Sequence, residues 1–515
     1  MPDSKMLFKL NRIGPRIPLA ALLGAAAIAG ALASPAHASP TQESVMQDDR
    51  LLLNTGPDSR EGALNEMQSL GVDTVHSLAV WRSYAPNADS RTKPSGFDGS
   101  DPAAYPPEAW DKLDDLVRSV NTRGMSLMLT PTGFTPSWAG GCGSGHTRQV
   151  CRPSATEFGK FVAALGKRYS GSYHDENEGG GVLPAVTRWT MWNEANLGGW
   201  LQPQSVVKNG RAVPVAPHLY RALAGAGIKA LQATGHGGDQ IMLGELAPLG
   251  QRTGSPSKRN TSPVTFWHEM LCLGANGRPL TGSARTSRGC PAKFSKLAIN
   301  AVSHHPYNRG GAGSPLTRGA SGDITLATIS RLQSVLAQGA RAGRIPSNLP
   351  IYYTEFGFQT NPPDHIFGMS WSRQAEYINE SDYIAYRNNH VASAAQYELY
   401  DEPNLDSFQT GLRLVGGKAK TSYGAYRLPI YVVRRRSKVG VFGQVRPAAD
   451  SSSQTVLIEN RSGGKWNVVK TITVSSQKGY FLVNTKYRSG LWRLSWTPSG
   501  GGSTVFSRAA AARSR

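Results

Sequence analysis

The chain has 515 residues, and its 56 Lys and Arg outnumber its 35 Asp and Glu, for a formal net charge of +21. Because one domain usually takes roughly 100–200 residues, we expect a large core and a second, smaller domain. The positive charge favours an anionic setting such as a cell wall, an acidic polysaccharide or a membrane surface. It does not indicate nucleic-acid binding, since the basic residues are scattered apart from the short run 434–438, which is typical of a solvated linker.

Residues 1–38 are predicted to be a secretory signal peptide. Four Lys and Arg residues precede a short apolar segment, and Ala36-His37-Ala38 then gives a small-x-small cleavage pattern. The alternative is an uncleaved membrane anchor, but the apolar run is short and interrupted by glycine. We therefore expect a secreted, extracellular protein with no membrane span after cleavage and a net charge of +18, since the segment also holds one acidic residue.

Eight apolar segments are predicted to be strands, with amphipathic helical segments between them. Apolar residues recur at i, i+3 and i+4 in the helical segments, several of which end in glycine. This alternation predicts an α/β fold, a (β/α)8 TIM barrel over residues 39–428. The alternative is an open doubly wound sheet, but no G-x-G-x-x-G follows the first strand. The expected strands are 44–54, 74–81, 125–132, 186–192, 240–246, 297–305, 351–357 and 391–400.

The pattern changes after residue 428. Residues 429–498 contain short alternating apolar runs with Gly and Ser turns and no helical periodicity, which predicts a small antiparallel, β-sandwich-like accessory domain. Residues 499–515 are rich in Gly, Ser, Ala and Arg, and we expect this tail to be disordered.

The four cysteines are expected to form two local disulfide bonds, Cys142–Cys151 and Cys272–Cys290, the simplest of three pairings. These bonds would shape loops after the third and fifth strands, at the rim of the barrel. A zinc site is the alternative, but neither C-x-x-C nor clustered histidine accompanies the cysteines. We expect no metal and no cofactor.

Two glutamates lie where predicted strands end. Glu194 follows the fourth strand, in "TMWNEANLGGW", and Glu355 follows the seventh, in "IYYTEFGFQT". Active sites of such barrels lie at the C-terminal ends of the strands, so the two carboxylates are expected to face each other across one cleft. Glu245 and Glu398 also lie near strand ends, and for each a salt-bridge or substrate-contact role is the alternative to a catalytic one.

Three motifs in chain order carry a resemblance to a known superfamily: 192–194 (Trp-Asn-Glu), 305–307 (His-Pro-Tyr) and 354–357 (Thr-Glu-Phe-Gly). The barrel, without the C-terminal domain, resembles the retaining glycoside hydrolases of clan A, which include cellulases, β-xylosidases and β-glucanases. The resemblance implies that Glu194 is the acid/base and Glu355 the nucleophile of a double displacement. It further implies that Asn193 binds the sugar 2-hydroxyl, that Tyr307 holds Glu355 in position, and that His305 contacts the sugar; a core histidine is the alternative for His305.

One position departs from the family pattern. His76 lies where many relatives have an arginine beside the nucleophile, so a protonated His76 would have to support the ionised Glu355 and would tie activity to acidic pH. Among tryptophans near strand ends, Trp81 and Trp200 are candidate platforms for sugar rings, with core packing as the alternative. Trp200 lies in a Gly-flanked loop and is the preferred candidate for an exposed platform.

The sequence therefore predicts a secreted retaining glycosidase that acts on a polysaccharide or cell-wall glycan. A second hypothesis is a carbohydrate-binding barrel of the cell surface that has lost turnover. It is suggested by His76, which lies where many relatives have an arginine. A third is a metal-dependent hydrolase that uses His304 and His305, although adjacent residues on a strand point to opposite faces. The sugar, the linkage and the choice between internal and terminal cleavage stay open.

Overall fold

The structure is a computed structural model that describes residues 39–177, 179–308, 313–448, 452–499 and 501–514. The predicted signal peptide lies outside these residues. Across the described part of the chain, none of the helices has the length and apolar character that crossing a bilayer would require.

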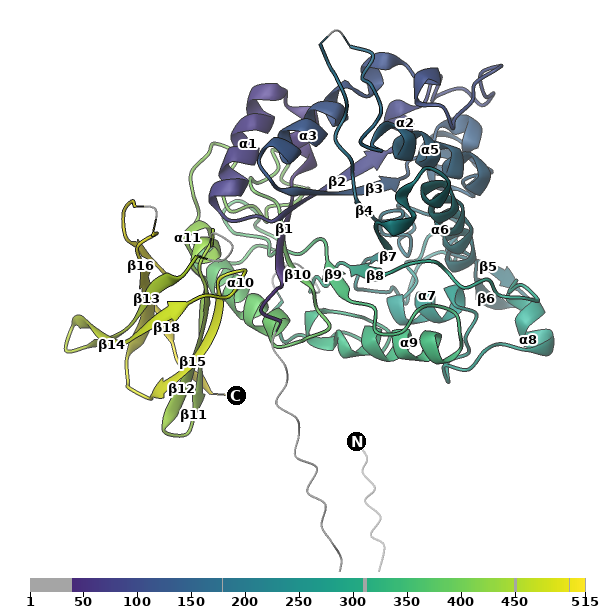
Figure 1. Ribbon diagram of the computed structural model, residues 1–515. Coiled ribbons are helices and arrows are strands. Elements are labelled where there is room, and N and C mark those ends of the chain that lie inside the picture. The colour runs from purple at the N-terminus through teal and green to yellow at the C-terminus, as the bar shows by residue number, and fades with distance from the viewer. Residues whose placement is uncertain (1–38, 178, 309–312, 449–451, 500, 515) are drawn as a thin grey trace, which may run out of the picture. The chain divides into compact units, whose positions relative to one another are not determined.

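Eight parallel strands form a nearly closed barrel, so the predicted (β/α)8 fold is confirmed (Figure 1). Each strand overlaps one of the eight predicted segments. The sheet order is β10-β1-β2-β3-β4-β7-β8-β9, and a parallel bridge between Ile351 and Val391 joins its two ends. The strands are β1 (Glu43–Gln47), β2 (Thr74–Val80), β3 (Ser126–Thr132), β4 (Arg188–Trp189), β7 (Gln240–Leu246), β8 (Ala301–His304), β9 (Ile351–Tyr353) and β10 (Ser393–Tyr397).

One long helix follows each barrel strand. In α3, for example, the buried apolar residues are Leu113, Leu116, Val117 and Val120, the i, i+3, i+4 and i+7 positions that face a sheet. The helices, in the order of the strands that they follow, are α1 (Pro57–Ser69), α3 (Asp111–Thr122), α5 (Ala155–Arg168), α6 (Ala216–Ala233), α7 (Pro263–Met270), α9 (Ser330–Arg341), α10 (Trp371–Tyr386) and α11 (Thr421–Arg427).

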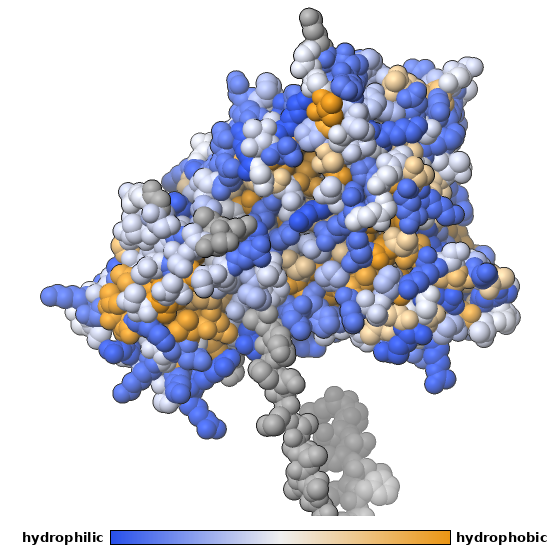
Figure 2. Space-filling view, in the orientation of Figure 1, coloured by the Kyte–Doolittle hydropathy of each residue, from blue (hydrophilic) through white to orange (hydrophobic). Residues whose placement is uncertain are grey.

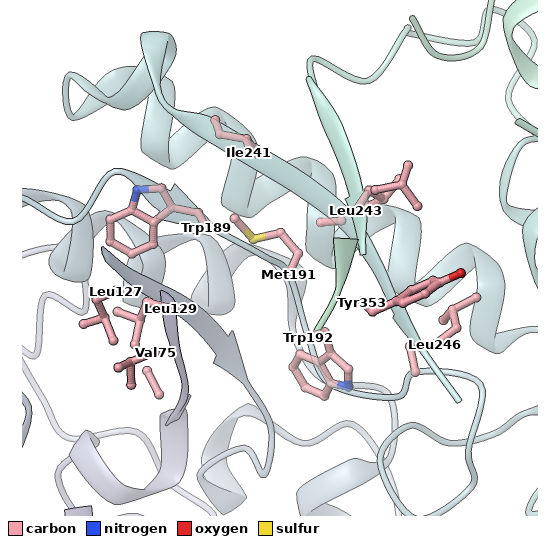
Figure 3. Packing of buried hydrophobic residues seen from close by; sticks show 14 of the residues in the cluster. Val75, Leu127, Leu129, Trp189, Met191, Trp192, Ile241, Leu243, Leu246 and Tyr353 are labelled. Atoms are coloured by element: carbon pink, nitrogen blue, oxygen red, sulfur yellow. The ribbon is translucent and has the colours of Figure 1, made fainter. Parts of the chain in front are cut away.

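Side chains alternate between the two faces of the barrel strands. Leu127 and Leu129 of β3 belong to the large core between strands and helices, next to Val75 of β2 (Figure 3). The residue between them, Met128, belongs to a separate small cluster with Met242 and others inside the barrel. Because paired residues of neighbouring parallel strands share a face, His76, which is paired with Met128, also points inward. The interior is therefore apolar at one level and polar nearer the C-terminal ends of the strands.

The C-terminal region folds into two small, mainly antiparallel sheets that enclose their own apolar core, as predicted. Several large apolar side chains of this region remain exposed, among them Val468, Leu491 and Phe506, and Figure 2 shows hydrophobic surface gathered there. The first sheet contains β11 (Ile430–Arg435), β12 (Lys438–Gln444) and β15 (Tyr480–Lys486); the second contains β13 (Gln454–Ser462), β14 (Lys465–Val474) and β16 (Leu491–Trp496).

The C-terminal tail differs from the expectation of disorder. It contributes β17 (Val505–Phe506) and β18 (Ala510–Ala511), which pair with β16, and β19 (Arg513–Ser514), which pairs with β11. Between the first two, Ser507 donates its amide to the Leu494 carbonyl at 3.0 Å. The tail thus supplies partners for backbone groups at the edges of the two sheets, a stabilising role that its composition does not reveal.

The described residues from 39 onward form one compact unit, and the barrel contacts the C-terminal sheets within it. Tyr383 and Tyr386 of α10 pack in one cluster with Tyr431, Phe442 and Tyr480 of the first C-terminal sheet. Burial of these aromatic side chains is the main apolar contribution to the contact.

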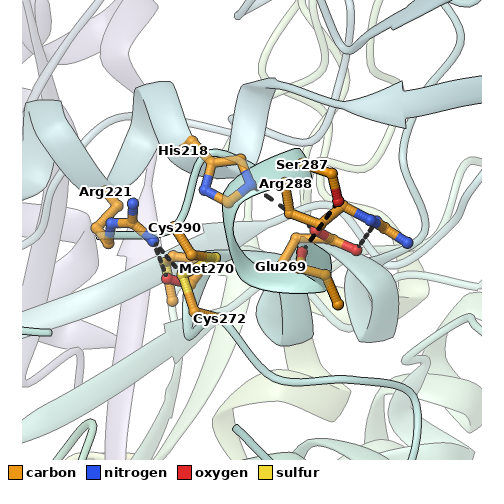
Figure 4. The surroundings of a disulfide bond; sticks show 9 residues. His218, Arg221, Glu269, Met270, Cys272, Ser287, Arg288 and Cys290 are labelled. Atoms are coloured by element: carbon orange, nitrogen blue, oxygen red, sulfur yellow. Dashed lines mark hydrogen bonds and ion pairs between the residues drawn. A yellow bond between two sulfur atoms is a disulfide. The ribbon is translucent and has the colours of Figure 1, made fainter. Parts of the chain in front are cut away.

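Both predicted disulfide bonds are present, Cys142–Cys151 and Cys272–Cys290. The first constrains the loop after β3, as expected. The second does not lie at the rim formed by the strand ends, because it follows α7 and belongs to the connection that leads to β8. There Arg221 of α6 lies 2.9 Å from the Cys272 sulfur and donates to the Met270 carbonyl at 3.0 Å (Figure 4). The Cys272–Cys290 disulfide bond therefore constrains the outer layer of helices.

Candidate active site

Four polar side chains converge because neighbouring parallel strands end at the same side of the barrel. Glu194 follows β4, Glu245 lies near the end of β7, His305 directly follows β8, and Glu355 follows β9. These four strands are consecutive in the sheet. The fold thus brings together three acidic groups and one imidazole at the end of the barrel where active sites of this fold lie.

His305 is at the centre of this group and is fully buried. Its Nε2 atom lies 2.8 Å from Glu245 Oε2, and its Nδ1 atom lies 3.2 Å from Glu194 Oε1 and 3.5 Å from Glu355 Oε2. Burial would lower the pKa of His305, but Glu355 and Glu245 outweigh it and raise that pKa well above its usual value. This balance favours the protonated form of His305, in which one N–H is directed to Glu245 and the other toward the two remaining glutamates.

Glu245 is the buried counterion of His305. Burial would raise its pKa, but His305 and His76 lower it to about 2. Thr354 donates its hydroxyl to Glu245 Oε1 at 2.9 Å, and the side chain has no exposed surface. The expectation that Glu245 could be a salt-bridge residue is confirmed, and its burial excludes direct contact with substrate in this structure.

Glu194 and Glu355 are the two carboxylates that remain accessible. One oxygen of each lies within 4.8 Å of the other and of a His305 nitrogen. The Glu194 side chain is 17% exposed and that of Glu355 is 9% exposed, which leaves both within reach of a bound molecule. The Tyr307 hydroxyl donates to Glu355 Oε2 at 3.3 Å, as the resemblance implies. Burial, reinforced by Glu194 and opposed by His305, raises the pKa of Glu355 to about 8. This shift favours the protonated form of Glu355.

The backbone is strained where it positions these groups. Trp192, Glu194 and Glu245 have φ values of 60°, 39° and 48°, in the left-handed region that non-glycine residues seldom occupy. The Glu194 amide donates to the Glu245 carbonyl at 2.8 Å, and the Asn196 side-chain amide donates to the Ala247 carbonyl at 2.9 Å. These bonds lock the segments that follow β4 and β7 together, a pattern common at functional sites.

The expected role of His76 beside the nucleophile is wrong. His76 is fully buried inside the barrel, with Nε2 2.7 Å from Thr130 Oγ1 and 3.7 Å from Glu245 Oε2. Burial lowers its pKa, which disfavours the protonated form. Among the described residues, the cation paired with Glu355 is His305, at 3.5 Å, whereas His76 has no exposed surface.

Asn193 is nearly buried, and its amide N–H donates to Thr132 Oγ1 at 2.8 Å. Its side-chain Oδ1 has no hydrogen-bond partner among the described residues. The implied bond from Asn193 to a sugar hydroxyl stays a prediction, and so does sugar contact by His305.

The metal hypothesis built on His304 and His305 finds no support in their geometry. His304 is fully buried, its Nε2 lies 2.7 Å from the Ile324 carbonyl, and burial lowers its pKa to about 4. Within the described ranges, two groups have the spacing of metal ligands. One is Glu194, His305 and Glu355, and the other includes Cys272 and Cys290, whose sulfurs are in a disulfide bond.

The aromatic candidates divide into buried and accessible residues. Trp81, expected as a platform, is 1% exposed and packs against Phe161 in the core, so that expectation is wrong. Trp200 is half-buried and stacks on Phe134, with ring centroids 5.1 Å apart and planes 3° apart. Sequence reasoning missed Phe134, which no motif marks. It also missed Phe408, which with Tyr307 lines a pocket of about 220 Å³ beside Glu355.

Scans against protein-family models and curated proteins found no match. Solved structures of glycoside hydrolases are similar at low scores. A β-glucosidase from Exiguobacterium marinum has 12% identity and a TM-score of 0.44 over 76% of this chain and 97% of that one. A protein named GH5_18 from Streptomyces cattleya, solved with Manβ1-4GlcNAc, has 14% identity and a TM-score of 0.43 over 74% and 78%. An endo-β-1,3-glucanase from Amycolatopsis mediterranei has 15% identity and a TM-score of 0.31 over 75% and 98%. At these scores the likeness carries no functional argument, so a functional assignment depends on the site itself.

Proposed function

We propose that this chain is a retaining glycoside hydrolase in which Glu355 is the nucleophile and Glu194 the acid/base. The observation that carries the proposal is the approach of the two carboxylates to within 4.8 Å at the C-terminal end of the barrel. Retaining enzymes hold the two carboxyl groups about 5–5.5 Å apart, whereas inverting enzymes need roughly 6.5–9.5 Å to admit a water molecule. The short separation supports direct attack by one carboxylate on the anomeric carbon.

The protons in the site suit the two steps. The raised pKa of Glu355 favours the binding of one proton at the site. In the reactive form this proton is on Glu194, which delivers it to the leaving oxygen while the ionised Glu355 forms the glycosyl ester. Esterification removes the charge of Glu355, so Glu194 then acts as the base that activates water.

His305 and Tyr307 assist Glu355 without reacting. The Tyr307 hydroxyl, 3.3 Å from Oε2, orients the carboxylate, and the His305 cation, 3.5 Å away, stabilises its negative charge. Both side chains come from the segment after β8, so a single segment positions the nucleophile.

The broader assignments belong to the same proposal. The substrate is a polysaccharide or cell-wall glycan, and the protein acts outside the cell, which its two disulfide bonds make chemically reasonable. The catalytic barrel spans 39–428, and the accessory β domain spans 429–498. Truncation after Leu428 should yield a folded barrel, as judged by circular dichroism and cooperative unfolding. An unfolded product would move the domain boundary.

The decisive experiment is Glu194→Ala assayed on aryl glycosides with and without azide. General acid assistance contributes about 10²–10⁴-fold, but an activated phenol leaves without a proton, so the variant should form the glycosyl-enzyme and then stall. Azide needs no base and should restart turnover, giving a glycosyl azide with the configuration of the substrate. A glycosyl azide of inverted configuration would contradict the covalent intermediate. Absence of hydrolysis by the unaltered protein across a panel of aryl glycosides would favour a binding protein.

A further inference from the structure

A second pocket lies on the same face of the barrel as the candidate active site. Its volume is about 380 Å³, and its lining comes mainly from the loops after β4, β7 and β8. Glu194 follows β4, Glu245 lies on β7, and His305 follows β8. The loop after β4 contributes the hairpin formed by β5 (Ser205–Lys208) and β6 (Arg211–Pro214). The side chains that matter for its chemistry are those of Arg252 and Arg259.

The pocket is fixed to the segment that carries Glu194. The Gly198 amide donates to Asn260 Oδ1 at 3.1 Å, and the Asn196 side chain donates to the Thr261 carbonyl at 3.1 Å. Asn260 and Thr261 both line the pocket. A glycan chain bound at Glu194 would therefore meet this pocket by extending along the same rim.

Two guanidinium groups line the pocket without acidic partners. The Arg252 side chain makes no hydrogen bond or ion pair with any residue that the structure describes. Arg259 donates to the Arg252 carbonyl at 3.0 Å and, within the same described ranges, pairs with no carboxylate. The acidic residue of the lining, Asp323, accepts backbone amides from Gly250 and Ala320. An unpaired Arg fork is suited to bidentate binding of a planar carboxylate.

The charge of the rim is asymmetric. The described parts of the loops after β4, β7 and β8 (190–215, 247–262, 305–308 and 313–325) hold six basic residues and two acidic residues, a net charge of +4. The segments after β10 and β1 (398–420 and 48–56) hold four basic and six acidic residues, a net charge of −2. An anionic chain would therefore be attracted to the side of the rim where Arg252 and Arg259 lie.

We propose that this pocket binds an anionic group of the substrate glycan, a uronic acid carboxylate or a sulfate ester, and that the enzyme acts on an acidic polysaccharide. That a glycan binds here rests on the proposed function, whereas the negative charge of that glycan is inferred from the pocket. Arg252 and Arg259 determine specificity, whereas the reaction itself takes place at the two glutamates.

Binding by the full-length Glu355→Gln variant tests the pocket without turnover. Isothermal titration calorimetry should show tighter binding of polygalacturonate than of its fully methyl-esterified form, or of dextran sulfate than of dextran. The pair with the larger difference identifies the anion. Adding Arg252→Gln, which removes no described contact, should weaken binding of the anionic polymer about three- to tenfold and leave binding of the neutral one unchanged. Raising NaCl from about 20 to about 200 mM should shrink the difference.

The matched control is Arg435→Gln with Lys438→Gln, two exposed positions that flank the turn between β11 and β12. This control removes twice the charge at a distant site and should retain the preference for the anionic polymer. Equal binding of charged and neutral polymers, or an equal loss in the control, would overturn the proposal. Aryl glycoside hydrolysis by the unaltered protein tests the proposed function separately. Failure of the pocket proposal can therefore be distinguished from failure of the proposed function.

Discussion

Two clusters of buried charge in this barrel differ in how many cations serve their carboxylates. Between α3 and α5, Arg168 donates Nε to Asp114 Oδ1 at 2.8 Å and Nη2 to Oδ2 at 2.5 Å, and Tyr169 donates its hydroxyl to Asp114 at 2.9 Å. Arg168 also pairs with Glu176 at 3.0 Å and with Asp175 at 3.6 Å, but Arg118 provides a second cation for Asp175. At the C-terminal end of the strands, by contrast, His305 is shared among Glu194, Glu245 and Glu355.

The difference separates a stabilising cluster from a reactive one. Burial raises the pKa of Asp114, but the bidentate Arg168 and the Tyr169 hydroxyl oppose that rise. Burial and the neighbouring Glu194 raise the pKa of Glu355 to about 8, because His305, the one cation shared with Glu194 and Glu245, opposes the rise only in part. The positive φ values of Glu194 and Glu245 add strain of about 1–3 kcal/mol each at the reactive cluster. The predictions below test this contrast.

The largest effect is expected for Glu355→Gln. Loss of the nucleophile should lower kcat/KM by roughly 10⁴-fold or more on every substrate. The same change should stabilise the fold on the order of 3 kcal/mol at pH 7, because the folded-state pKa of about 8 exceeds the unfolded value of 4.5. With the pKa raised, the wild-type protein loses stability as pH rises from 4.5 toward 8, and the variant should not. Urea unfolding at several pH values measures this.

An exposed glutamate provides the control for that substitution. Glu108→Gln makes the same chemical change at the surface and should alter neither activity nor stability measurably. If the Glu355→Gln variant were less stable than this control, the charge of Glu355 would be stabilised by its neighbours in the folded protein, as the charge of Asp114 is by Arg168.

The second effect is expected for Arg168→Met, which leaves Asp114 buried without its partner. Removing one member of a buried pair costs about 3–5 kcal/mol, while kcat of the folded fraction should stay unchanged. Denaturant unfolding and active-site titration measure the two quantities. The double variant Arg168→Met, Asp114→Leu should recover most of the loss, since two apolar side chains replace the pair. A fall in kcat for either variant would link the two clusters.

The smallest of the three effects is expected for Glu245→Gln, which removes the counterion of His305. The pKa of His305 should fall, the cation beside Glu355 should weaken, and kcat/KM should drop about 10–100-fold. The wild-type pKa of Glu245, about 2 against 4.5 when unfolded, contributes stability above pH 4.5 that is lost as pH falls toward 2. The variant should lack this acid-induced loss. Partial recovery of activity by Glu245→Asp would distinguish a charge effect from a packing effect.

Local patterns in the sequence were enough for the barrel and for the meeting of the two glutamates. Strand and helix periodicities are short-range properties, and parallel strands that share one direction must end together. The pairing of Cys142 with Cys151 and of Cys272 with Cys290 follows from nearness in the chain, which favours small loops.

What surrounds each side chain was decided by tertiary structure alone. Whether His76 or His305 provides the cation near Glu355 depends on depth inside the barrel, which the alternation of a strand does not encode. Trp81 and Trp200 both lie near strand ends, yet only Trp200 keeps a partly exposed face, because contacts from distant helices bury Trp81. The unpaired state of Arg252 likewise requires the positions of three separate loops. Residue type and period are local, whereas burial, charge compensation and access arise from chain segments that meet only in the folded protein.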